Sequence, residues 1–341
     1  MKKKLAILNS DPITCSYGGV APIMKNLDPY LQEAFDVKYF FLSEKEKRNI
    51  LPGRLKVMLM LWHKRKELSQ FDFILSHVPE GSFVTSFTDV PYCHVYHGND
   101  NPMKLSRYRF GKYFAFVFDI FFKRIEKTSV LKYTVGPVWG DKKKLFNPVR
   151  HSVTVKPISE RSGFIYAGRL ESMKHIDRLI SIYSKIPEQI RDTNDLYIAG
   201  NGTQLQNLKT LAAKSGLESK VHFLGALPNE ILIETDSTKK ILLMTSSHEG
   251  LPTAIAEAFS VGVPVISTNP GDIARVLKND YNGYIFPLDF QDEDYIQGIV
   301  KILADYDRFS RNALESSAIF KAETIARNII GDINEIIRQQ C

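Results

Sequence analysis

The sequence predicts an α/β protein with two parallel, doubly wound sheets. Short β-rich runs alternate with segments of helical length along nearly the whole chain, a pattern typical of parallel sheets joined by crossover helices. With 341 residues, the chain is long enough for two domains. Its 44% hydrophobic and 24% charged content is that of a globular protein and excludes disordered, collagen-like and coiled-coil classes.

Strand candidates occur in both halves of the chain. In the first half they are Leu5–Leu8, Val37–Phe41, Phe73–Ser76, Tyr92–Tyr96 and Leu131–Val135. In the second half they are Gly163–Tyr166, Leu196–Ala199, Val221–Leu224, Ile241–Met244, Val263–Ser267 and Gly283–Phe286. The pattern indicates two Rossmann-like domains facing one another across a cleft. In such sheets ligands bind beyond the carboxyl ends of the strands.

A polar stretch with a proline, residues 150–162, separates the two strand series. We therefore expect one Rossmann-like domain over 1–155 and a second Rossmann-like domain over 156–320. Two helix-length segments follow the last strand, Asp292–Phe320 and Ala322–Gln340. The final helix, within 321–341, is expected to pack back on the first domain.

The charge and cysteine content of the sequence indicate where in the cell the protein is located. Residues 1–160 hold 26 Lys and Arg against 15 Asp and Glu, or +11, whereas the remainder holds 19 against 23, or −4. Three scattered cysteines (Cys15, Cys93 and Cys341) form neither a disulfide framework nor a zinc cluster, and indicate a reducing compartment. The N-terminus is interpreted as a first strand rather than a signal peptide, and no run is long enough to span a bilayer. We expect a cytoplasmic protein, with the inner face of the cell membrane as a place to act.

One loop combines features of a ligand site. It follows the apolar run Ile241–Met244 and leads into a helix at Pro252, which suits a first helical turn. Glu249 lies in the loop and Glu257 inside the helix. A helix start offers free backbone N–H groups that suit a phosphate or a sugar hydroxyl group. Two carboxylates beside these donors can hold a polyhydroxylated ligand.

These residues also carry a resemblance. The Glu249-x7-Glu257 spacing, the following GVPVI and the later NGYIF are similar to the donor-binding half of family 4 glycosyltransferases, which have the GT-B fold. The segment YAGRLESMKH, beginning at Tyr166, resembles the family's G-R-L…K element. IAGNG at Ile198 and VHFLGAL at Val221 resemble its G-x-G and F-x-G elements. The resemblance covers roughly residues 163–290.

The resemblance implies that the domain over 1–155 is the N-terminal, acceptor-side domain and that the domain over 156–320 binds the nucleotide sugar. It also implies roles for individual residues in the second domain. Arg169 and Lys174 would contact the diphosphate of a sugar nucleotide, whose leaving group gains negative charge as the glycosidic bond breaks. Glu257 would bind the ribose, and Glu249 the donor sugar. Further donor-site residues would be Gly168, Gly200, Leu224, Gly225, Gly250, Leu251 and Pro252, with Leu224 and Gly225 beside the base.

The first domain offers two more candidates. Gly18 and Gly19 follow the first strand and precede a helix, where adjacent glycines allow a phosphate to approach the backbone. By resemblance, His97 at a strand end would contact the donor sugar or the transferring group, and we include it among the catalytic residues with Glu249, Arg169 and Lys174. His77 and His94 are interpreted as structural.

Two segments of the first domain have the character of membrane-binding helices. Gly53–Leu68 combines an apolar stripe with five basic residues, and Lys104–Lys127 interleaves aromatic and basic residues. An ordinary crossover helix with a solvated face is the alternative.

No metal-binding motif occurs in the sequence. Asp292-Glu-Asp294 is a D-x-D pattern, but it lies at a predicted helix start, where acidic residues interact favourably with the helix dipole. No nucleic-acid recognition motif accompanies the basic residues.

The resemblance implies a metal-independent, retaining glycosyltransferase without a cofactor. It would move a sugar from a nucleoside-diphosphate sugar, expected to be a UDP-sugar, to a glycan or lipid-linked glycan in surface polysaccharide biosynthesis, such as lipopolysaccharide or capsule. Because no nucleophile stands out, we favour attack on the face from which the diphosphate leaves. Two alternatives remain: a GT-B sugar-nucleotide epimerase, and a catalytically silent scaffold that binds a partner transferase.

Overall fold

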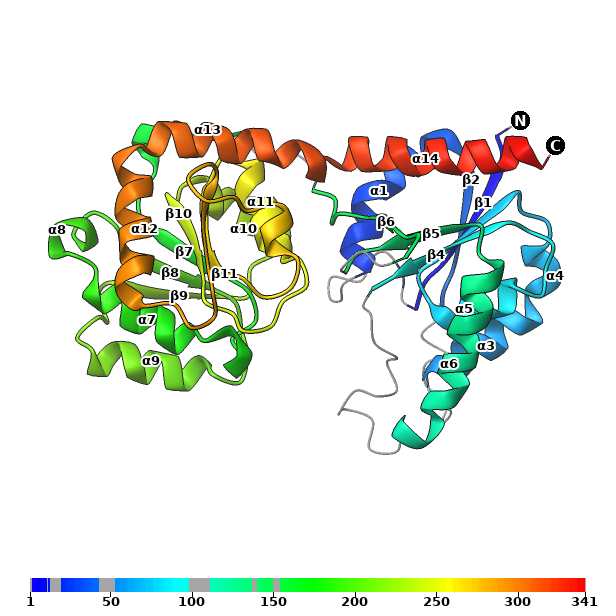
Figure 1. Cartoon of the computed structure of the whole chain (residues 1–341), viewed down its shortest axis with the longest axis horizontal. Coiled ribbons are helices and arrows are strands. Elements are labelled where there is room, and N and C mark those ends of the chain that lie inside the picture. The colour runs from blue at the N-terminus through cyan, green and yellow to red at the C-terminus, as the bar shows by residue number, and fades with distance from the viewer. Residues whose placement is uncertain are drawn as a thin grey trace. The chain divides into compact units, whose positions relative to one another are not determined.

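The computed structural model describes residues 2–10, 12, 20–42, 53–97, 111–136, 140–149 and 154–340. The chain divides into two compact units (Figure 1). Unit 1 comprises Met1–Pro148 together with Ala322–Cys341, and unit 2 comprises Val149–Lys321. The boundary expected after residue 155 therefore lies a few residues inside unit 2, and the last helix belongs to unit 1.

Unit 1 contains a six-stranded parallel sheet in the order β2-β1-β3-β4-β5-β6. Its strands are β1 (Lys4–Leu8), β2 (Asp36–Phe40), β3 (Phe73–Ser76), β4 (Tyr92–Tyr96), β5 (Leu131–Thr134) and β6 (Lys143–Lys144). The central strands are buried on both faces, so β1, β3 and β4 read as continuous apolar runs rather than as alternating ones.

Helices cover both faces of this sheet. They are α1 (Ala21–Ala34), α3 (Gly53–His63), α4 (Arg65–Leu68), α5 (Pro79–Thr85), α6 (Gly111–Thr128) and α14 (Ala322–Gln339). On one face, α1 and α14 lie side by side (Figure 1) and share a core with Ile7 and Leu75. On the other face, α3 and α5 pack against Ala6 and Ile74. Unit 1 thus has a helix–sheet–helix arrangement.

Unit 2 contains a second six-stranded parallel sheet, in the order β12-β11-β10-β7-β8-β9. Its strands are β7 (Phe164–Ala167), β8 (Leu196–Ala199), β9 (Val221–Gly225), β10 (Ile241–Met244), β11 (Val265–Thr268) and β12 (Gly283–Phe286). Its core gathers apolar side chains of β7, β8 and β10 with those of α7, α9 and α12. Figure 1 shows α10 and α11 across the sheet from α12.

The helices of unit 2 are α7 (Ile176–Lys185), α8 (Glu188–Arg191), α9 (Leu205–Lys214), α10 (Asn229–Ser237), α11 (Thr253–Ser260), α12 (Asp292–Ala304) and α13 (Tyr306–Ser316). Short 3₁₀ turns cover Ile158–Glu160, Ser172–Lys174, Ile273–Arg275 and Ser317–Phe320. The segment 292–320, expected as one helix-length element, is two α-helices and a 3₁₀ turn, because the chain leaves helical geometry at Asp305 (φ −134°, ψ 47°).

The strand order fixes where ligands can bind. In each sheet the order reverses once, between β1 and β3 in unit 1 and between β7 and β10 in unit 2. Helices leave neighbouring strands in opposite directions at such a switch point, which opens a crevice beyond the carboxyl ends of those strands. The fold class predicted from sequence, two doubly wound α/β units, is confirmed.

Candidate functional site

The predicted donor-site residues of unit 2 lie at the switch point of its sheet. Gly168, Arg169 and Lys174 follow the carboxyl end of β7, and Glu249 follows that of β10. These two strands pair directly, with Ile241 opposite Phe164. The loops that leave them are therefore neighbours, which brings residues 75 positions apart in the sequence to one edge of the sheet.

Lys174 and Glu249 form an ion pair at this edge. The Lys174 ammonium donates a hydrogen bond to Glu249 Oε1 over 2.5 Å, and the two side chains are only 10% and 12% exposed. The Ser246 hydroxyl donates to the same carboxylate oxygen over 2.8 Å. The Lys174 ammonium has three N–H donors, so pairing with Glu249 leaves others for a ligand.

Hydrogen bonds between the two loops hold this pair in place. The Ser247 N–H donates to the carbonyl of Met173 over 2.9 Å, and the Thr245 hydroxyl donates to that of His175 over 2.8 Å. His175 has left-handed backbone geometry (φ 49°, ψ 43°), which is uncommon for a residue other than glycine. This turn ends the 3₁₀ segment that carries Lys174 and starts α7.

Arg169 adds an exposed cation to the site, and its charge adds to the hydrogen bonds from Thr203 in lowering the pKa of Glu171. Its side chain is exposed, and within the described ranges no carboxylate pairs with its guanidinium. Its backbone is fixed instead, because the Tyr166 hydroxyl donates to the Arg169 carbonyl over 3.1 Å. The nearby Glu171 carboxylate accepts a hydrogen bond from the Thr203 hydroxyl over 2.7 Å. Arg169 is therefore available to an anionic ligand.

Three predicted glycines form a row across the ends of β7, β8 and β9. The Gly168 N–H donates to the Ala199 carbonyl over 3.0 Å, and the Gly200 N–H to the Gly225 carbonyl over 2.7 Å. A Cβ atom on Gly200 would lie 1.8 Å from the Gly168 carbonyl oxygen. The close approach of these two loops therefore requires glycine at position 200. Leu224 is the half-buried residue preceding Gly225 in β9.

Glu257 is buried in α11, one turn after the helix begins. Its Oε1 accepts a hydrogen bond from the Asn229 amide over 2.5 Å, and burial raises its pKa to about 7. Asp236 in α10 is fully buried, and burial followed by the charge of Glu257 raises its pKa well above the usual range. Below neutral pH Glu257 is thus largely protonated in the folded chain.

The loop between Glu249 and Glu257 turns sharply into α11. Gly250 is exposed, Leu251 is buried, and Pro252 is the N-cap residue rather than a residue of the first helical turn, because α11 begins at Thr253. The Asp272 N–H donates to the Gly250 carbonyl over 3.1 Å. A Cβ on Gly271 would lie 2.1 Å from the Glu249 carbonyl oxygen, so the loop after β11 lies directly against this turn.

In unit 1, His97 follows β4 and is exposed at its surface. Its Nε2 lies 3.0 Å from Nδ1 of His77, which follows β3. His94 lies on the opposite face, as strand alternation predicts, with its Nδ1 2.7 Å from the Ser82 hydroxyl. Gly18 and Gly19, the other candidates in this unit, lie outside the described residues.

Several residues that support the site were not predicted from the sequence. Ser246 binds Glu249, Asn229 binds Glu257, and the Gly271–Asp272 turn supports the Glu249 loop. The Asn-Pro-Gly-Asp run after β11 is a turn signal that could have identified this loop. The burial of Asp236 could not be predicted from the sequence, because an aspartate within a helical pattern is usually a solvated charge.

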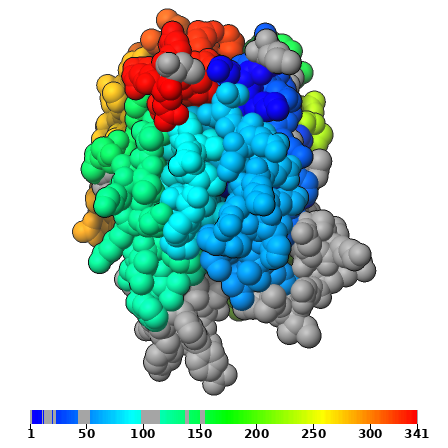
Figure 2. Space-filling view, turned by 90° about the vertical axis from the view of Figure 1, so that its right-hand side faces the viewer, coloured from blue at the N-terminus to red at the C-terminus, as the bar shows by residue number. Residues whose placement is uncertain are grey.

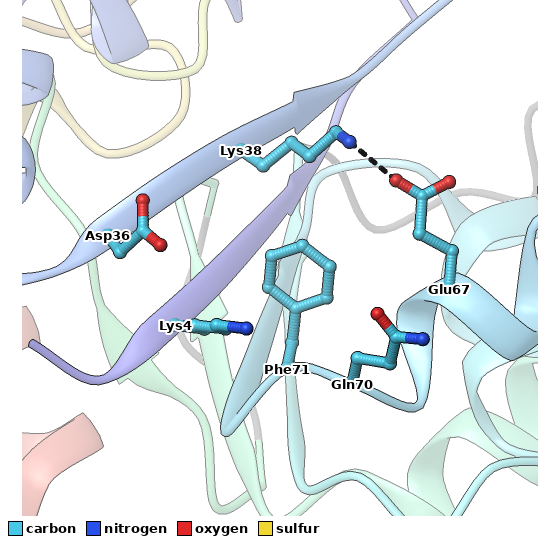
Figure 3. A pocket seen from close by; sticks show the side chains of 6 residues that line it. All are labelled: Lys4, Asp36, Lys38, Glu67, Gln70 and Phe71. Atoms are coloured by element: carbon cyan, nitrogen blue, oxygen red, sulfur yellow. Dashed lines mark hydrogen bonds and ion pairs between the residues drawn. The ribbon is translucent and has the colours of Figure 1, made fainter.

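A hollow elsewhere in unit 1 has no features of a ligand site. Figure 3 shows it between Lys4, Asp36, Lys38, Glu67, Gln70 and Phe71. Lys4 and Asp36 open β1 and β2, so the hollow lies at the amino ends of these strands, opposite the ligand-binding edge. Lys38 and Glu67 pair with each other over 2.6 Å (Figure 3).

Two features are absent from the described ranges: a cluster of metal ligands and a membrane-spanning helix. Among the described residues, no cluster of three or more His, Cys, Asp or Glu side chains could hold a metal ion. No helix in the same part of the chain is long and apolar enough to cross a bilayer.

The two doubly wound parallel sheets are those of the GT-B fold of glycosyltransferases. Sucrose-phosphate synthase from Thermosynechococcus elongatus has this fold, with a TM-score of 0.77 at 16% identity over 100% of both chains. Anabaena HepE, solved with UDP and glucose, gives a TM-score of 0.70 at 15% identity over 98% of this chain and 100% of its own.

The sequence comparisons point to the same class. Residues 154–318 match the family model of glycosyl transferases group 1. The lipopolysaccharide 1,6-galactosyltransferase of Escherichia coli K12 is 30% identical over 173 residues, which is 48% of this chain and 45% of that protein. An uncharacterized glycosyltransferase of Methanocaldococcus jannaschii is 28% identical over 159 residues, 46% of this chain and 39% of its own. The match spans less than half the length of these curated relatives.

Proposed function

We propose that this chain is a retaining glycosyltransferase that moves a sugar from a UDP-sugar to a glycan or a lipid-linked glycan. The observation that carries the proposal is the largely buried Lys174–Glu249 pair beside the exposed Arg169, at the switch point of unit 2. This site lies in the segment that matches the group 1 family model. The UDP found with HepE supports a uridine nucleotide as the donor.

Each site residue has a separate role in the proposed transfer reaction. Arg169 and the remaining N–H donors of Lys174 bind the diphosphate and stabilise the charge that develops as it leaves. Glu249, fixed by Lys174 and Ser246, orients the hydroxyl groups of the donor sugar. Glu257 accepts hydrogen bonds from the ribose. Because two cations already serve the leaving group, transfer proceeds without a metal ion, and activity should persist in EDTA.

Retention follows from attack on the face that the diphosphate leaves. In this scheme the departing phosphate oxygen takes the proton of the acceptor hydroxyl, so no enzyme nucleophile takes part. The anomeric configuration of the product, read from its proton coupling constant by NMR, tests this step. A product of inverted configuration would exclude same-face attack.

Calorimetric titration tests the donor site. UDP, GDP and ADP and their common sugar conjugates are titrated into the wild-type protein and into Arg169→Ala and Lys174→Ala. We expect binding of UDP conjugates, weakened at least tenfold in both variants, and unchanged in Lys214→Ala, an exposed lysine at the end of α9. Absence of nucleotide binding in the wild-type protein would favour a catalytically silent scaffold, and copurification with an active transferase would support that role.

For the acceptor, we propose a glycan of the lipopolysaccharide or O-antigen kind, used at the inner face of the membrane. Relatives named lipopolysaccharide 1,6-galactosyltransferase and O-antigen biosynthesis glycosyltransferase support this acceptor class. If the acceptor is lipid-linked, unit 1 needs a surface that binds anionic lipid.

A surface of α3, α5 and α6 has that character. Exposed apolar side chains lie at helical spacing on α3 (Leu55, Leu59 and Trp62) and on α6 (Phe116 and Ile120), with Phe87 between them. The Trp62 and Phe87 rings are 5.7 Å apart, and the Arg124 guanidinium lies 3.9 Å from the Phe87 ring centre. Figure 2 shows α5, in cyan, between α3 and α6 on one face of unit 1. Aromatic and basic side chains together suit a headgroup interface.

Sedimentation with vesicles tests this surface. We expect binding to phosphatidylglycerol-containing vesicles and little binding to pure phosphatidylcholine. The double variant Trp62→Ser/Ile120→Ser should lose it, whereas Ile231→Ser, which changes an exposed apolar residue of α10 in unit 2, should not. Equal sedimentation of both variants would refute membrane contact through this surface.

A further inference from the structure

Two acidic side chains are buried where α10 packs against α11 in unit 2 (Figure 1). Asp236 of α10 is fully buried, and Glu257 of α11 is 7% exposed. Asn229, which donates to Glu257 Oε1 over 2.5 Å, precedes Asp236 by seven residues. Residues seven apart in an α-helix share a face. Asn229 and Asp236 therefore lie on the same side of α10, and the charge of Glu257 acts on Asp236.

Asp236 has no hydrogen-bond partner in the described part of the chain. Both of its carboxyl oxygens are buried and unpaired there. Lys239 also acts on Asp236, but its ammonium lies 3.4 Å from the centre of the Tyr197 ring, and no ion pair joins it to Asp236 among the described residues. A carboxylate buried without partners is costly, so such a group keeps its proton. Asp236 is therefore a neutral acid with an O–H donor to offer.

The other groups around Glu257 supply no competing charge. α11 also packs against α13, the 3₁₀ turn Ser317–Phe320 and β11. The buried residues on the first two of these are uncharged at neutral pH: Tyr306, Phe309, Ser310, Ala313, Ser317 and Phe320. The residues of β11 (Val265–Thr268) are also uncharged.

The charged residues at the two ends of α11 have partners of their own. Arg161 donates to the carbonyls of Val261 and Gly262, just beyond the helix. Glu249, before the helix, is paired with Lys174. Within the described ranges, Asn229 and Asp236 are thus the polar groups that bear on the Glu257 carboxyl group.

The ionised form of Glu257 suits a ribose best. A carboxylate can accept hydrogen bonds from both hydroxyl groups of a vicinal diol, and such charge-assisted bonds are stronger than neutral ones. Burial opposes ionisation and raises the pKa of Glu257 to about 7. Hydrogen bonds donated to the carboxylate reduce this cost. Asn229 supplies one such bond, and the neutral acid of Asp236 can supply a second from the same side of α10.

We propose that Asp236 is a positioning residue for the nucleotide, which donates a hydrogen bond to ionised Glu257 directly or through one buried water molecule. This inference rests on the proposed function, because the sugar nucleotide supplies the ribose. When the nucleotide binds, Glu257 releases its proton to the solvent and receives the ribose hydroxyl groups, while Asp236 keeps its own proton. Nucleotide affinity should therefore decrease as the pH falls below 7.

Calorimetry from pH 6 to pH 9 tests this coupling, with UDP-glucose and UDP-galactose as probes because their diphosphates do not titrate in this range. In the wild-type protein the Kd should rise as the pH falls below 7, approaching tenfold per pH unit. Asp236→Asn keeps a neutral donor and should reproduce this profile. Asp236→Leu removes the donor at similar volume, so its affinity at pH 6 should fall about tenfold, with the loss shrinking towards pH 9.

A stability measurement and a neighbouring variant separate this role from a structural one. Asp236→Leu removes a buried unpaired acid, so the unliganded variant should unfold at the same or a higher urea concentration. Ser237→Ala is the matched control, because Ser237 is equally buried and its hydroxyl donates within α10 to the Glu234 carbonyl. Its affinity profile should be that of the wild-type protein. An Asp236→Leu profile like that of the wild type, or an equal loss in Asp236→Asn, would overturn the proposal.

Carboxyl ¹³C NMR of the unliganded protein gives a readout that needs no nucleotide. In protein labelled at the glutamate carboxyl carbon, the resonance assigned with Glu257→Gln is followed from pH 5 to pH 9. Its midpoint should be the same in the wild type, Asp236→Asn and Ser237→Ala, and about one pH unit higher in Asp236→Leu. An unchanged midpoint in Asp236→Leu overturns the role of Asp236. A raised midpoint in a protein that binds neither probe counts against the donor site alone.

Discussion

At the scale of residues, the buried Lys174–Glu249 pair sets the character of the donor site. Each charge satisfies the other in a place that water hardly reaches. Removing one partner of such a pair leaves an unpaired charge, which is more destabilising than removing both. Charge balance between these two residues should therefore matter for folding as well as for ligand binding.

Lys174→Met should destabilise unit 2 by about 3 kcal/mol, because Glu249 then stays buried without its cation. The double variant Lys174→Met/Glu249→Gln should recover most of that loss while remaining unable to bind UDP tightly. Urea unfolding of the two variants and the wild-type protein measures the difference. If the double variant is no more stable than the single one, the two charges do not act as a pair.

Glu257 should make stability depend on pH. Its folded pKa of about 7 exceeds the unfolded value of 4.5, so the folded chain binds more protons between these values. The stabilisation from protonated Glu257 is then fully present below about pH 4.5 and decreases as the pH rises to about 7. Above that pH the free energy of unfolding is about 3 kcal/mol lower than at low pH.

Glu257→Gln keeps the carbonyl oxygen that accepts from Asn229 but cannot ionise. The difference in unfolding free energy between this variant and the wild-type protein should therefore grow from pH 4.5 to 7 in favour of the variant. Urea unfolding across pH 4.5–8 measures it, with Asp236→Asn as a second variant because Asp236 faces Glu257. A difference independent of pH would contradict the raised pKa.

The sequence predicted the order of the site residues better than their contacts. The Glu249-x7-Glu257 spacing and the motif around Arg169 could be recognised along the chain, but the contact between Lys174 and Glu249 depends on β7 pairing with β10. Asn229 and Asp236 lie on a separate helix and meet Glu257 only in the folded unit. Roles in binding and catalysis stay predictions.

At the scale of elements, the predicted strands all occur in the structure, with ends within two residues. Buried parallel strands are short apolar runs between turn residues, so their length and their flanking residues separate them from helices. β6 was missed because it is two lysines long and has no apolar signal. The break at Asp305 was missed because the amphipathic pattern continues from α12 into α13.

Gly200→Ala should strongly destabilise unit 2, since the added Cβ would lie 1.8 Å from a backbone oxygen that cannot move without separating β7 from β8. Gly331→Ala is the matched control: it lies exposed within α14, nothing is within 4 Å of the added atom, and it should stabilise by about 1 kcal/mol. Thermal unfolding of both variants measures the contrast. Equal melting temperatures would show that the two loops can separate freely.

At the scale of the whole molecule, the chain leaves unit 1 at Pro148, forms unit 2 and returns as α14. Buried residues of α14, among them Ile325, Ile329 and Ile333, belong to the same core as β1 and α1. Unit 1 is therefore discontinuous in sequence, whereas unit 2 is one continuous segment.

Truncation after Lys321 should unfold unit 1 and spare unit 2, because it removes α14, one of the two helices that share a core with this face of the sheet. Hydrogen exchange should show lost protection in β1, β3 and β4 with retained protection in β7, β8 and β10. Ile333→Ala is a milder version and should cost about 3 kcal/mol in unit 1. Protection that survives in β1 after truncation would show that α14 is dispensable for this core.

The return of α14 also bears on how the chain folds while it is being made. Domains generally fold as units during translation, the N-terminal one first. Here the first strands to leave the ribosome must wait for Ile325–Ile337 before their core can close, whereas all of unit 2 has emerged by then. Unit 2 should thus be folded first, and nascent unit 1 should expose to chaperones the part of its apolar core that α14 covers, until that helix is synthesised.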